Sequence, residues 1–300
     1  MIVGTRGSAL ALWQTNHVVG RLSVPVQVQT IVTRGDVDRA NRLQGAQLEK
    51  GFFTAELEAA LREKRIDFAV HSLKDLPTRL PEDLDIAAVL ERASPCDRLL
   101  VREDALAQSA LPLKDGAKVG ASSLRRDALL KLHAPQAKAA LLRGNVPTRV
   151  RKLQAGDYDA IILAAAGLSR LGLETQGLKV FDLNPKKWIP APGQGAIAIE
   201  CRRGDTKTIE ALQSLLHKPT QRATKIEREL LRVFEGGCSA PFGAYCEGST
   251  VWVGAEVEGT WRQKKLAVAD MPDEKFYRDA IADISHGESN DDESWLYRAV

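Results

Sequence analysis

The stretch IDFAVHSLKDLPTRLP, residues 66–81, joins a short apolar run to a polar loop. Residues 66–70 are predicted to form a buried strand, because the run is short, apolar and followed by loop residues. The loop that starts at His71 leaves the carboxyl end of this strand. Open α/β sheets usually bind their ligands at that end of their strands. The stretch therefore predicts an α/β sheet with a binding site near residues 71–81.

The sequence before this stretch also alternates between strand and helix patterns. Ser8 and Thr54 each stand where a helix N-cap belongs, with good helix formers after them. The predicted elements are strands at 2–4 and 24–32 and helices at 8–22 and 54–64. This alternation is typical of an α/β fold.

Two later segments resemble the first ones. VGTRGSALAL (3–12) and VGASSLRRDALL (119–130) both give a strand, a glycine, a serine, an arginine and a helix. IDFAVHSLKDL (66–76) and YDAIILAAAGL (158–168) share a strand pattern before a loop. We interpret these as two related α/β lobes. Chance similarity between two ordinary strand-to-helix turns is the alternative, because such turns are common.

Two polar or proline-containing crossings, at 91–98 and 184–201, predict that the chain passes between the lobes twice and leaves a cleft between them. The expected domains are a first α/β lobe over 1–92 and 191–213, a second α/β lobe over 96–188, and a small C-terminal α+β domain over 214–300.

The C-terminal region has patterns of its own. Residues 219–234 and 273–285 are predicted to be helical, and residues 244–270 alternate as hairpins do. The last fifteen residues, 286–300, are acidic, and we expect them to be poorly ordered.

Composition argues against several classes of protein. Charged residues make up 27% of the chain, both signs are interspersed, and the formal net charge is +3, so no general affinity for nucleic acid or membranes is expected. No run approaches the roughly 20 apolar residues that a membrane span needs, and the first residues lack a signal-peptide pattern. The four sparse cysteines suit reduced thiols and predict no disulfide. These features favour a soluble, cytoplasmic protein, and we expect a monomer.

Metal and nucleotide motifs are missing from the sequence. CxxC, HExxH and GxxxxGK[ST] do not occur, and GQG at 193–195 is only a fragment of a dinucleotide fingerprint. We therefore predict no metal site and no nicotinamide or ATP site.

Arginine placement points to an anionic ligand. Several arginines stand at or near strand-to-helix transitions, where the first helical N–H groups already favour an anion. Guanidinium groups bind carboxylates in bidentate fashion, so several facing one cleft would suit a ligand with many carboxylates or phosphates. For any single arginine, a solvated surface position is the alternative. The arginines are Arg6, Arg125, Arg126, Arg143, Arg149 and Arg170.

The segment HSLKD, residues 71–75, places an imidazole, a hydroxyl, an ammonium and a carboxylate together. Asp75 could stabilise a developing cation or transfer a proton. Alternatively, Asp75 and Lys74 could pair with each other or bond to the local backbone. Spacing alone does not choose between these interpretations.

Cys238, in EGGCSAPFG (235–243), is the most unusual cysteine. A lone cysteine is usually a small buried apolar residue. Here Gly236 and Gly237 allow close approach of another group, and Pro241 stiffens the exit. An attachment point or a nucleophile is the second interpretation.

Along essentially its whole length the chain resembles the porphobilinogen deaminase family, also called hydroxymethylbilane synthase. The resemblance rests on segments in the family's order and near its spacings. They are TRGSALALWQ, VTRGD, KGFFTAELE, DFAVHSLKDLP, SSLRRDALL, LRGNVPTR, YDAIILAAAGLSRLGL, PGQGAIAIECR and EGGCSAPFG.

This resemblance implies a fold and a reaction. It implies two lobes like those of periplasmic binding proteins and a smaller third domain that presents the cysteine loop. Cys238 aligns with the cysteine that holds a dipyrromethane cofactor through a thioether. Four porphobilinogen molecules are then joined head to tail, each losing ammonia, and hydroxymethylbilane is released for haem biosynthesis. Each pyrrole carries an acetate and a propionate, which explains the arginines.

The same resemblance assigns roles to individual residues. Asp75 aligns with the catalytic aspartate, which is expected to assist loss of ammonia. Residues aligned with cofactor-binding positions are Ser72, Lys74, Ser122, Ser123, Arg125, Arg126, Arg149 and Cys238. Residues aligned with substrate-binding positions are Arg6, Ser8, Lys50, Arg143, Arg170 and Gln194. Lys50 falls in the segment that resembles the family's active-site lid.

The sequence departs from the family pattern locally. Ala121 stands where many members have threonine, and QGAQLEK (44–50) lacks the extra glycines commonly found there. Neither departure touches Asp75 or Cys238. A competing hypothesis is a two-lobe protein that binds a small anion without transforming it. A DNA-associated regulator is disfavoured, because the sequence has no helix-turn-helix pattern and no basic face.

Overall fold

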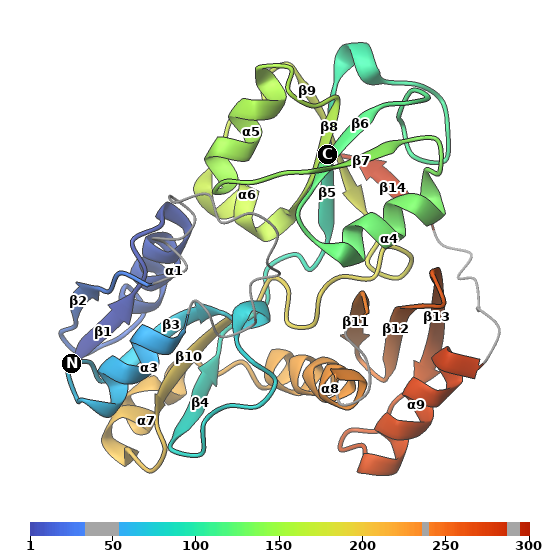
Figure 1. The fold of residues 1–300 in the computed structure, drawn as a ribbon. Helices are drawn as coiled ribbons and strands as arrows, with labels where there is room; N and C mark the ends of the chain where they lie inside the picture. Colours follow the sequence, from blue (N-terminus) through green and yellow to red (C-terminus); the bar gives the residue numbers. More distant parts are fainter. Residues whose placement is uncertain (34–53, 236–239, 287–294) are drawn as a thin grey trace. The chain divides into compact units, whose positions relative to one another are not determined.

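A computed structural model describes residues 1–33, 54–235, 240–286 and 295–300. By compactness these residues form two units (Figure 1). The first comprises 1–93 and 195–222, and the second comprises 94–194 and 223–300. The predicted crossings at 91–98 and 184–201 contain two of the three boundaries between these units, and the third, between residues 222 and 223, was not predicted.

The first unit is built on a five-stranded sheet of order β2-β1-β3-β10-β4. Its strands β1, β2 and β3 run parallel, while β10 is antiparallel to both of its neighbours. The strands are β1 (Ile2–Thr5), β2 (Gln27–Thr30), β3 (Phe68–Ser72), β4 (Leu84–Val89) and β10 (Ile197–Arg202). The helices are α1 (Ala9–Val19), α3 (Ala55–Arg62) and α7 (Thr206–Leu212).

The second unit contains a six-stranded sheet of order β14-β9-β5-β8-β6-β7. Strands β7, β6 and β8 run parallel, and β5 is antiparallel to β8 and β9. The strands are β5 (Asp97–Arg102), β6 (Lys118–Ala121), β7 (Lys138–Leu141), β8 (Ala160–Ala164), β9 (Leu178–Leu183) and β14 (Tyr297–Ala299). The helices are α4 (Leu124–His133), α5 (Val146–Gln154) and α6 (Ala165–Leu171).

The two sheets repeat one topology. Read as β2-β1-β3-β10-β4 and β7-β6-β8-β5-β9, they have parallel strands first and then one antiparallel strand in the fourth place. The strands that were paired by sequence, β1 with β6 and β3 with β8, occupy equivalent places. The prediction of two related α/β lobes is therefore confirmed, and shared topology accounts for the sequence likeness better than chance does.

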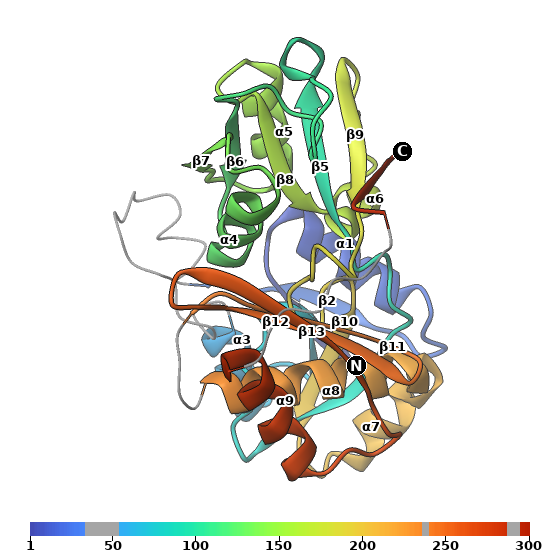
Figure 2. The same ribbon diagram turned by 90° about the vertical axis from the view of Figure 1, so that its right-hand side faces the viewer.

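The C-terminal region adds a three-stranded antiparallel sheet, β11 (Phe242–Glu247), β12 (Thr250–Val257) and β13 (Thr260–Ala267). Helices α8 (Lys218–Glu235) and α9 (Glu274–His286) cover one face of it (Figure 2). The predicted helices and hairpins of this region are confirmed, as is the fold class of two α/β lobes with a smaller α+β part. The prediction that 214–300 form a separate domain stays a prediction.

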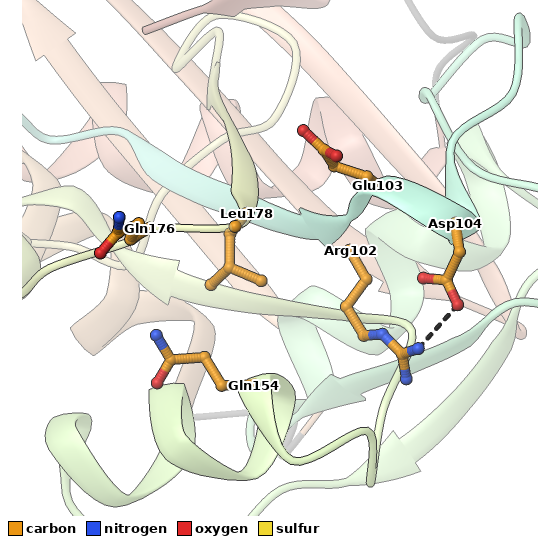
Figure 3. A pocket seen from close by; sticks show the side chains of 7 residues that line it. Arg102, Glu103, Asp104, Gln154, Gln176 and Leu178 are labelled. Carbon is orange, nitrogen blue, oxygen red and sulfur yellow. Dashed lines mark hydrogen bonds and ion pairs between the residues drawn. The ribbon is translucent and has the colours of Figure 1, made fainter.

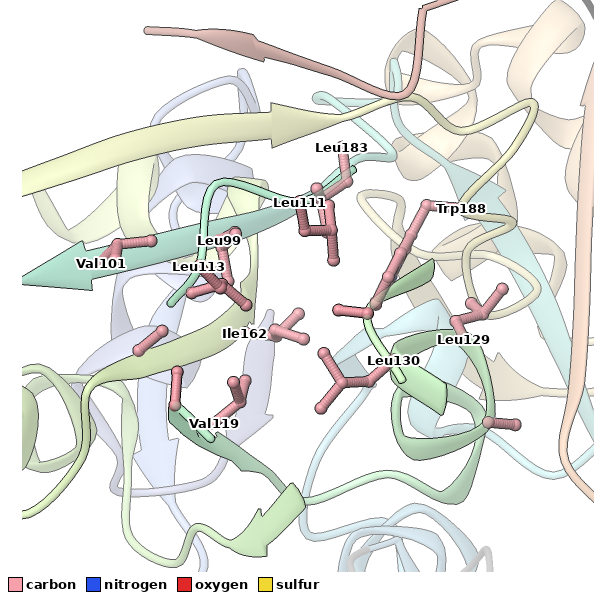
Figure 4. Close-up of a cluster of buried hydrophobic side chains, with 14 of the residues drawn as sticks. Leu99, Val101, Leu111, Leu113, Val119, Leu129, Leu130, Ile162, Leu183 and Trp188 are labelled. Atoms are coloured by element: carbon pink, nitrogen blue, oxygen red, sulfur yellow. The ribbon is translucent and has the colours of Figure 1, made fainter. Parts of the chain in front are cut away.

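Apolar side chains from distant parts of the second unit share one core (Figure 4). Leu99, Ile162 and Leu130 pack with the fully buried Trp188 between sheet and α4. Trp252, from the C-terminal sheet, belongs to the same cluster, and α4 packs against β12 and β13. Helix α4, which carries Arg125 and Arg126, therefore packs against both the six-stranded sheet and the C-terminal strands β12 and β13.

The last residues of the chain are more ordered than the sequence predicted. Residues 297–299 form β14 on the edge of β9, although residues 286–300 were expected to be poorly ordered; of that stretch, residues 287–294 lie outside the described part of the chain. Asn184 donates its side-chain amide to Trp295 O at 2.6 Å, and the Phe181 and Tyr297 rings meet edge-on. The open edge of β9 supplies backbone partners that the acidic composition did not reveal.

The two predicted helix caps have different outcomes. Ser8 caps α1, because its Oγ accepts from Ala11 N at 3.3 Å. Thr54 precedes α3 but makes no capping bond, and its hydroxyl donates to Glu58 Oε1 at 2.7 Å instead. The N-cap position predicted for Thr54 is therefore confirmed, but its side chain does not cap the helix, because its backbone is in the αR region (φ −111°, ψ −24°) and not extended.

Candidate functional site

In the first unit, the predicted residues follow the carboxyl ends of two neighbouring parallel strands. Arg6 and Ser8 come after β1, and Ser72, Lys74 and Asp75 come at the end of β3. The carboxyl ends of adjacent parallel strands lie at one edge of a sheet, so this fold brings both groups to the same edge.

The loop that carries Asp75 is anchored by the leucines on either side of it. Residues 73–75 form a single 3-10 turn. Leu73 and Leu76 are both 1% exposed, and Leu73 N donates to Ala196 O at 3.0 Å. Asp75 between them is exposed. The apolar neighbours are buried while the carboxylate stays accessible, as a catalytic role requires.

Ser72 is held by a residue that the sequence reasoning missed. Gln14, buried on α1, donates Nε2 to Ser72 Oγ at 2.8 Å, and Ser72 Oγ lies 3.3 Å from Gln14 Oε1. A polar residue on the buried face of a helix was the available signal, because a buried side-chain amide needs a hydrogen-bond partner. The pair fixes the hydroxyl at the start of the Asp75 turn.

His71 does not share the exposed loop with Asp75. Its side chain is buried, and Nε2 lies 3.1 Å from Oε2 of the fully buried Glu200 on β10. The imidazole therefore belongs to the interior of the first sheet, although the sequence placed it next to Lys74 and Asp75.

In the second unit, the predicted residues again gather at the carboxyl ends of adjacent parallel strands. Those of β6, β7 and β8 lie at one edge, because these three strands are neighbours in the sheet. Ser122, Ser123, Arg125 and Arg126 follow β6, Arg143 and Arg149 follow β7, and Arg170 follows β8. The structure therefore brings the first six of these residues to one sheet edge, and Arg170 stands in the last turn of α6.

Arg149 joins two of these strand ends. Its Nη1 donates to Ser122 Oγ at 2.7 Å, and its Nε donates to Gly144 O at 2.8 Å. Gly144 has a φ of +116°, and a Cβ there would lie 2.8 Å from the Thr148 side chain. Helix α5, capped by Asn145, thereby places the guanidinium beside the turn after β6.

Arg125 and Arg126 are almost completely buried, with exposed fractions of 4% and 5%. Both donate to Asp97, from Nη2 of Arg125 to Oδ2 at 2.8 Å and from Nη2 of Arg126 to Oδ1 at 2.7 Å. Two guanidiniums thus share one carboxylate, which leaves one net positive charge at the start of α4. Sequence reasoning found the arginines but missed Asp97.

Electrostatics stabilise the charged form of this cluster. Burial alone would raise the pKa of Asp97, but the charges and hydrogen bonds of Arg125 and Arg126 hold that pKa far below its ordinary value. Burial lowers the pKa of Arg125, and it lowers the pKa of Arg170 to about 10. Asp97, Arg125 and Arg170 therefore remain ionised at neutral pH.

The remaining predicted site residues differ in burial, and two of them lie outside the described residues. Gln194 is buried and donates Nε2 to Pro95 O at 2.8 Å and to Asp97 Oδ1 at 2.9 Å. Arg143 is exposed. Lys50 and Cys238 lie outside the residues that the structure describes.

A separate pocket lies at the opposite edge of the second sheet (Figure 3). Arg102, Asp104, Gln154 and Leu178 are among its lining residues, and Arg102 pairs with Asp104 at 2.6 Å. Arg102 ends β5, which is antiparallel to β8, so the pocket is remote from the carboxyl ends of β6, β7 and β8. None of the predicted site residues lines it.

The donor set at the carboxyl ends of β6, β7 and β8 fits a bound group with several carboxylates. Arg125 Nε and Arg126 Nε are buried and have no hydrogen-bond partner among the described residues. Buried N–H donors are rarely left without an acceptor, so a ligand carboxylate is the expected partner. Within the described residues there is no cluster of three or more potential metal ligands. In the same part of the chain, no helix is long and apolar enough to cross a membrane.

Comparisons with known proteins agree with this chemistry. A family model described as "Porphobilinogen deaminase, dipyromethane cofactor binding domain" matches residues 1–210. Relatives named porphobilinogen deaminase from Carboxydothermus hydrogenoformans and Desulforamulus reducens are 47% and 46% identical. Both alignments cover 82% of this chain and 79% of the relative.

A relative of the same name from Synechococcus elongatus is 41% identical over 93% of this chain and 85% of its own length. Among solved structures, the periplasmic sulfonate-binding protein SsuA from Methylobacillus flagellatus is 12% identical. That alignment covers 80% of this chain and 69% of that one, with a TM-score of 0.43.

Proposed function

The chain belongs to the porphobilinogen deaminase family, and on this basis we propose how its residues divide the work. The enzyme is a transferase, a hydroxymethylbilane synthase, with a dipyrromethane cofactor. It condenses four porphobilinogen molecules head to tail. Each condensation forms one carbon–carbon bond and breaks the bond from a side-chain methylene to its amine. The proton lost from the attacked ring carbon balances the ammonia that leaves.

We propose that Cys238 holds the cofactor through a thioether. The support is the match of EGGCSAPFG to the family's cysteine loop, together with the burial of Cys96, Cys201 and Cys246. Cys201 lies on β10, Cys246 lies on β11 and Cys96 directly precedes β5, and burial raises the pKa of Cys201 to about 11. A thiolate is the nucleophilic form, so none of the three is suited to attachment.

The carboxylates of the pyrroles are proposed to bind at the carboxyl ends of β6, β7 and β8. The unpartnered buried Nε groups of Arg125 and Arg126 carry this assignment, because they are donors that the fold leaves for a ligand. Arg149, Ser122 and Ser123 surround the same turn. When bound, the cofactor supplies the free pyrrole carbon to which the first substrate is joined.

Asp75 is proposed to be the catalytic residue. Its accessible carboxylate follows β3 between two buried leucines, and it can accept hydrogen bonds from pyrrole N–H groups. An anionic group at this place stabilises positive charge on the ring from which ammonia departs. It also provides a site for the proton that moves to the leaving amine.

Ammonia release tests this assignment. Asp75→Asn should keep the cofactor mass but release ammonia from porphobilinogen about 100-fold more slowly than the unmodified enzyme. The matched control is Asp85→Asn, which alters an exposed carboxylate on β4 of the same unit and should have normal activity. Normal turnover in Asp75→Asn would show that the catalytic role is misassigned. Absence of ammonia release by the unmodified protein would favour the anion-binding alternative.

We further propose that the enzyme is monomeric and cytoplasmic. The large exposed apolar residues among those described are spread over both units, with Val28 and Val32 in or beside β2, Leu141 on β7 and Met271 after β13. The three described cysteines are free thiols, as expected in a reducing compartment. Sedimentation equilibrium tests the first proposal, since a dimer mass would contradict it.

The C-terminal segment 214–300 is proposed to act as a third domain. It is supported by the separate sheet β11–β13 and by an apolar core of its own, which includes Ile226, Val253 and Ile284. Limited proteolysis that releases a folded fragment from this region would support the proposal. Cleavage only after global unfolding would oppose it.

A further inference from the structure

Asp97 lies at the sheet edge that carries the predicted arginines. It is the first residue of β5, and it pairs in register with Ala164, the last residue of β8. Its side chain is fully buried. A carboxylate placed this way needs full compensation by hydrogen bonds and positive charge.

Both oxygens of Asp97 accept two hydrogen bonds. Oδ1 accepts from Arg126 Nη2 at 2.7 Å and from Gln194 Nε2 at 2.9 Å. Oδ2 accepts from Arg125 Nη2 at 2.8 Å and from Trp188 Nε1 at 3.0 Å. The four donors come from two segments, so Asp97 fixes the mutual arrangement of α4 and the segment from 188 to 194.

Each arginine is held at a second point by a backbone carbonyl. Arg125 Nη1 donates to Ile189 O at 2.8 Å, and Arg126 Nη1 donates to Ile162 O at 3.1 Å. Both Nη atoms of each planar guanidinium are therefore engaged, which sets the direction of Nε–H. These two Nε–H groups are the buried donors that have no partner in the described structure.

We propose that Asp97 is a positioning residue of the cofactor site: it orients Arg125 and Arg126 so that their Nε–H groups face a pyrrole carboxylate. This inference rests on the proposed function. Asp97 touches neither substrate nor cofactor in this scheme and acts only through the arginines. A simple structural ion pair would need one arginine, whereas this carboxylate is shared by two and leaves the Nε donor of each unused.

Two substitutions of Asp97 distinguish the effect of the carboxylate's position from the effect of its charge. Asp97→Asn removes the charge and converts one acceptor into a donor. Asp97→Glu keeps the charge but moves the carboxylate by one methylene. The matched control is Asp182→Asn on β9, which removes a buried carboxylate 2.7 Å from Arg98 Nε and does not touch Arg125 or Arg126.

The readout is the fraction of purified full-length protein that carries the cofactor mass, with thermal stability measured in parallel. Asp97→Asn and Asp97→Glu should each lose cofactor loading by about tenfold or more, because a small displacement of a binding group has a large effect. Asp182→Asn should remain fully loaded. Full loading of Asp97→Glu would overturn the positional role. Equal loss of loading in all three variants, in proportion to lost stability, would also overturn the proposal.

A spectroscopic measurement covers the case in which the Asp97 variants fail to fold. Nitrogen-15 spectra of the arginine Nε–H groups are compared between the unmodified enzyme and full-length Cys238→Ser. The signals of Arg125 and Arg126 should shift when the cofactor is present, while the Arg98 signal should not. Unchanged Arg125 and Arg126 signals would refute the proposal. An unmodified enzyme without cofactor mass would instead refute the proposed function, so the two failures can be told apart.

Discussion

Replacing Glu227 by glutamine should lower the free energy of unfolding by about 3 kcal/mol, although the two side chains have nearly the same size. Glu227 lies on α8 and is fully buried. Its Oε2 accepts from Gly193 N at 2.8 Å, and its Oε1 accepts from Cys246 N at 2.9 Å. One carboxylate thus connects the segment before Gln194 to strand β11.

The magnitude follows from these two bonds. A hydrogen bond to a buried charged group contributes about 1.5–3 kcal/mol, and a buried donor left without an acceptor costs about 1–3 kcal/mol. Glutamine keeps one acceptor oxygen, but its amide NH₂ faces the other backbone N–H. One bond is lost and one N–H group is left without a partner, which gives the expected value of about 3 kcal/mol.

The control is Glu229→Gln on the same helix. Glu229 pairs with Arg232 at 2.6 Å, and both side chains are about 29% exposed. Loss of such a pair should cost at most about 1 kcal/mol. Urea denaturation can be followed by tryptophan fluorescence, because four of the five tryptophans belong to the second unit, as Glu227 does. If Glu227→Gln and Glu229→Gln destabilise the protein equally, the assigned role of the buried carboxylate is wrong.

Two further predictions concern binding and pH. Arg149→Gln should lower the fraction of purified enzyme that carries the cofactor mass about tenfold, because it removes a guanidinium assigned to a cofactor carboxylate, while Arg151→Gln on the same helix should leave that fraction unchanged; equal fractions in the two variants would contradict the assignment. Asp205 caps α7 and accepts a hydrogen bond from Arg202. Burial raises the pKa of Asp205, but the hydrogen bonds from Thr208 and Arg202 outweigh it and lower this pKa. Its charge therefore stabilises the fold above the unfolded pKa, and the stability advantage over Asp205→Asn should shrink below about pH 4; an advantage in urea midpoint that persists to pH 3 would refute this.

The topology could be predicted from local patterns because each strand-to-helix unit carries its own signals. Strand periodicity, the Ser8 cap and the repeated serine and arginine after β1 and β6 all act within a few residues. Together they predicted two related lobes and the sheet edges where the site residues gather. The helices and hairpins of the C-terminal region were predictable for the same reason.

Partners that meet only through folding were not predictable. Asp97 stands in a polar crossing between lobes, and nothing around it in the sequence indicates that Arg125, Arg126, Trp188 and Gln194 converge on it. Strand β14 was missed because an acidic stretch precedes it and its partner strand lies more than a hundred residues earlier.

The central claim is that Cys238 carries a covalent pyrrole primer, and the intact mass of the purified protein tests it most directly. The unmodified enzyme should exceed the mass of its 300-residue chain by two pyrrole units, and Cys238→Ser should have the mass of the chain alone. An active enzyme with no added mass, or a Cys238→Ser variant that keeps it, would contradict the claim.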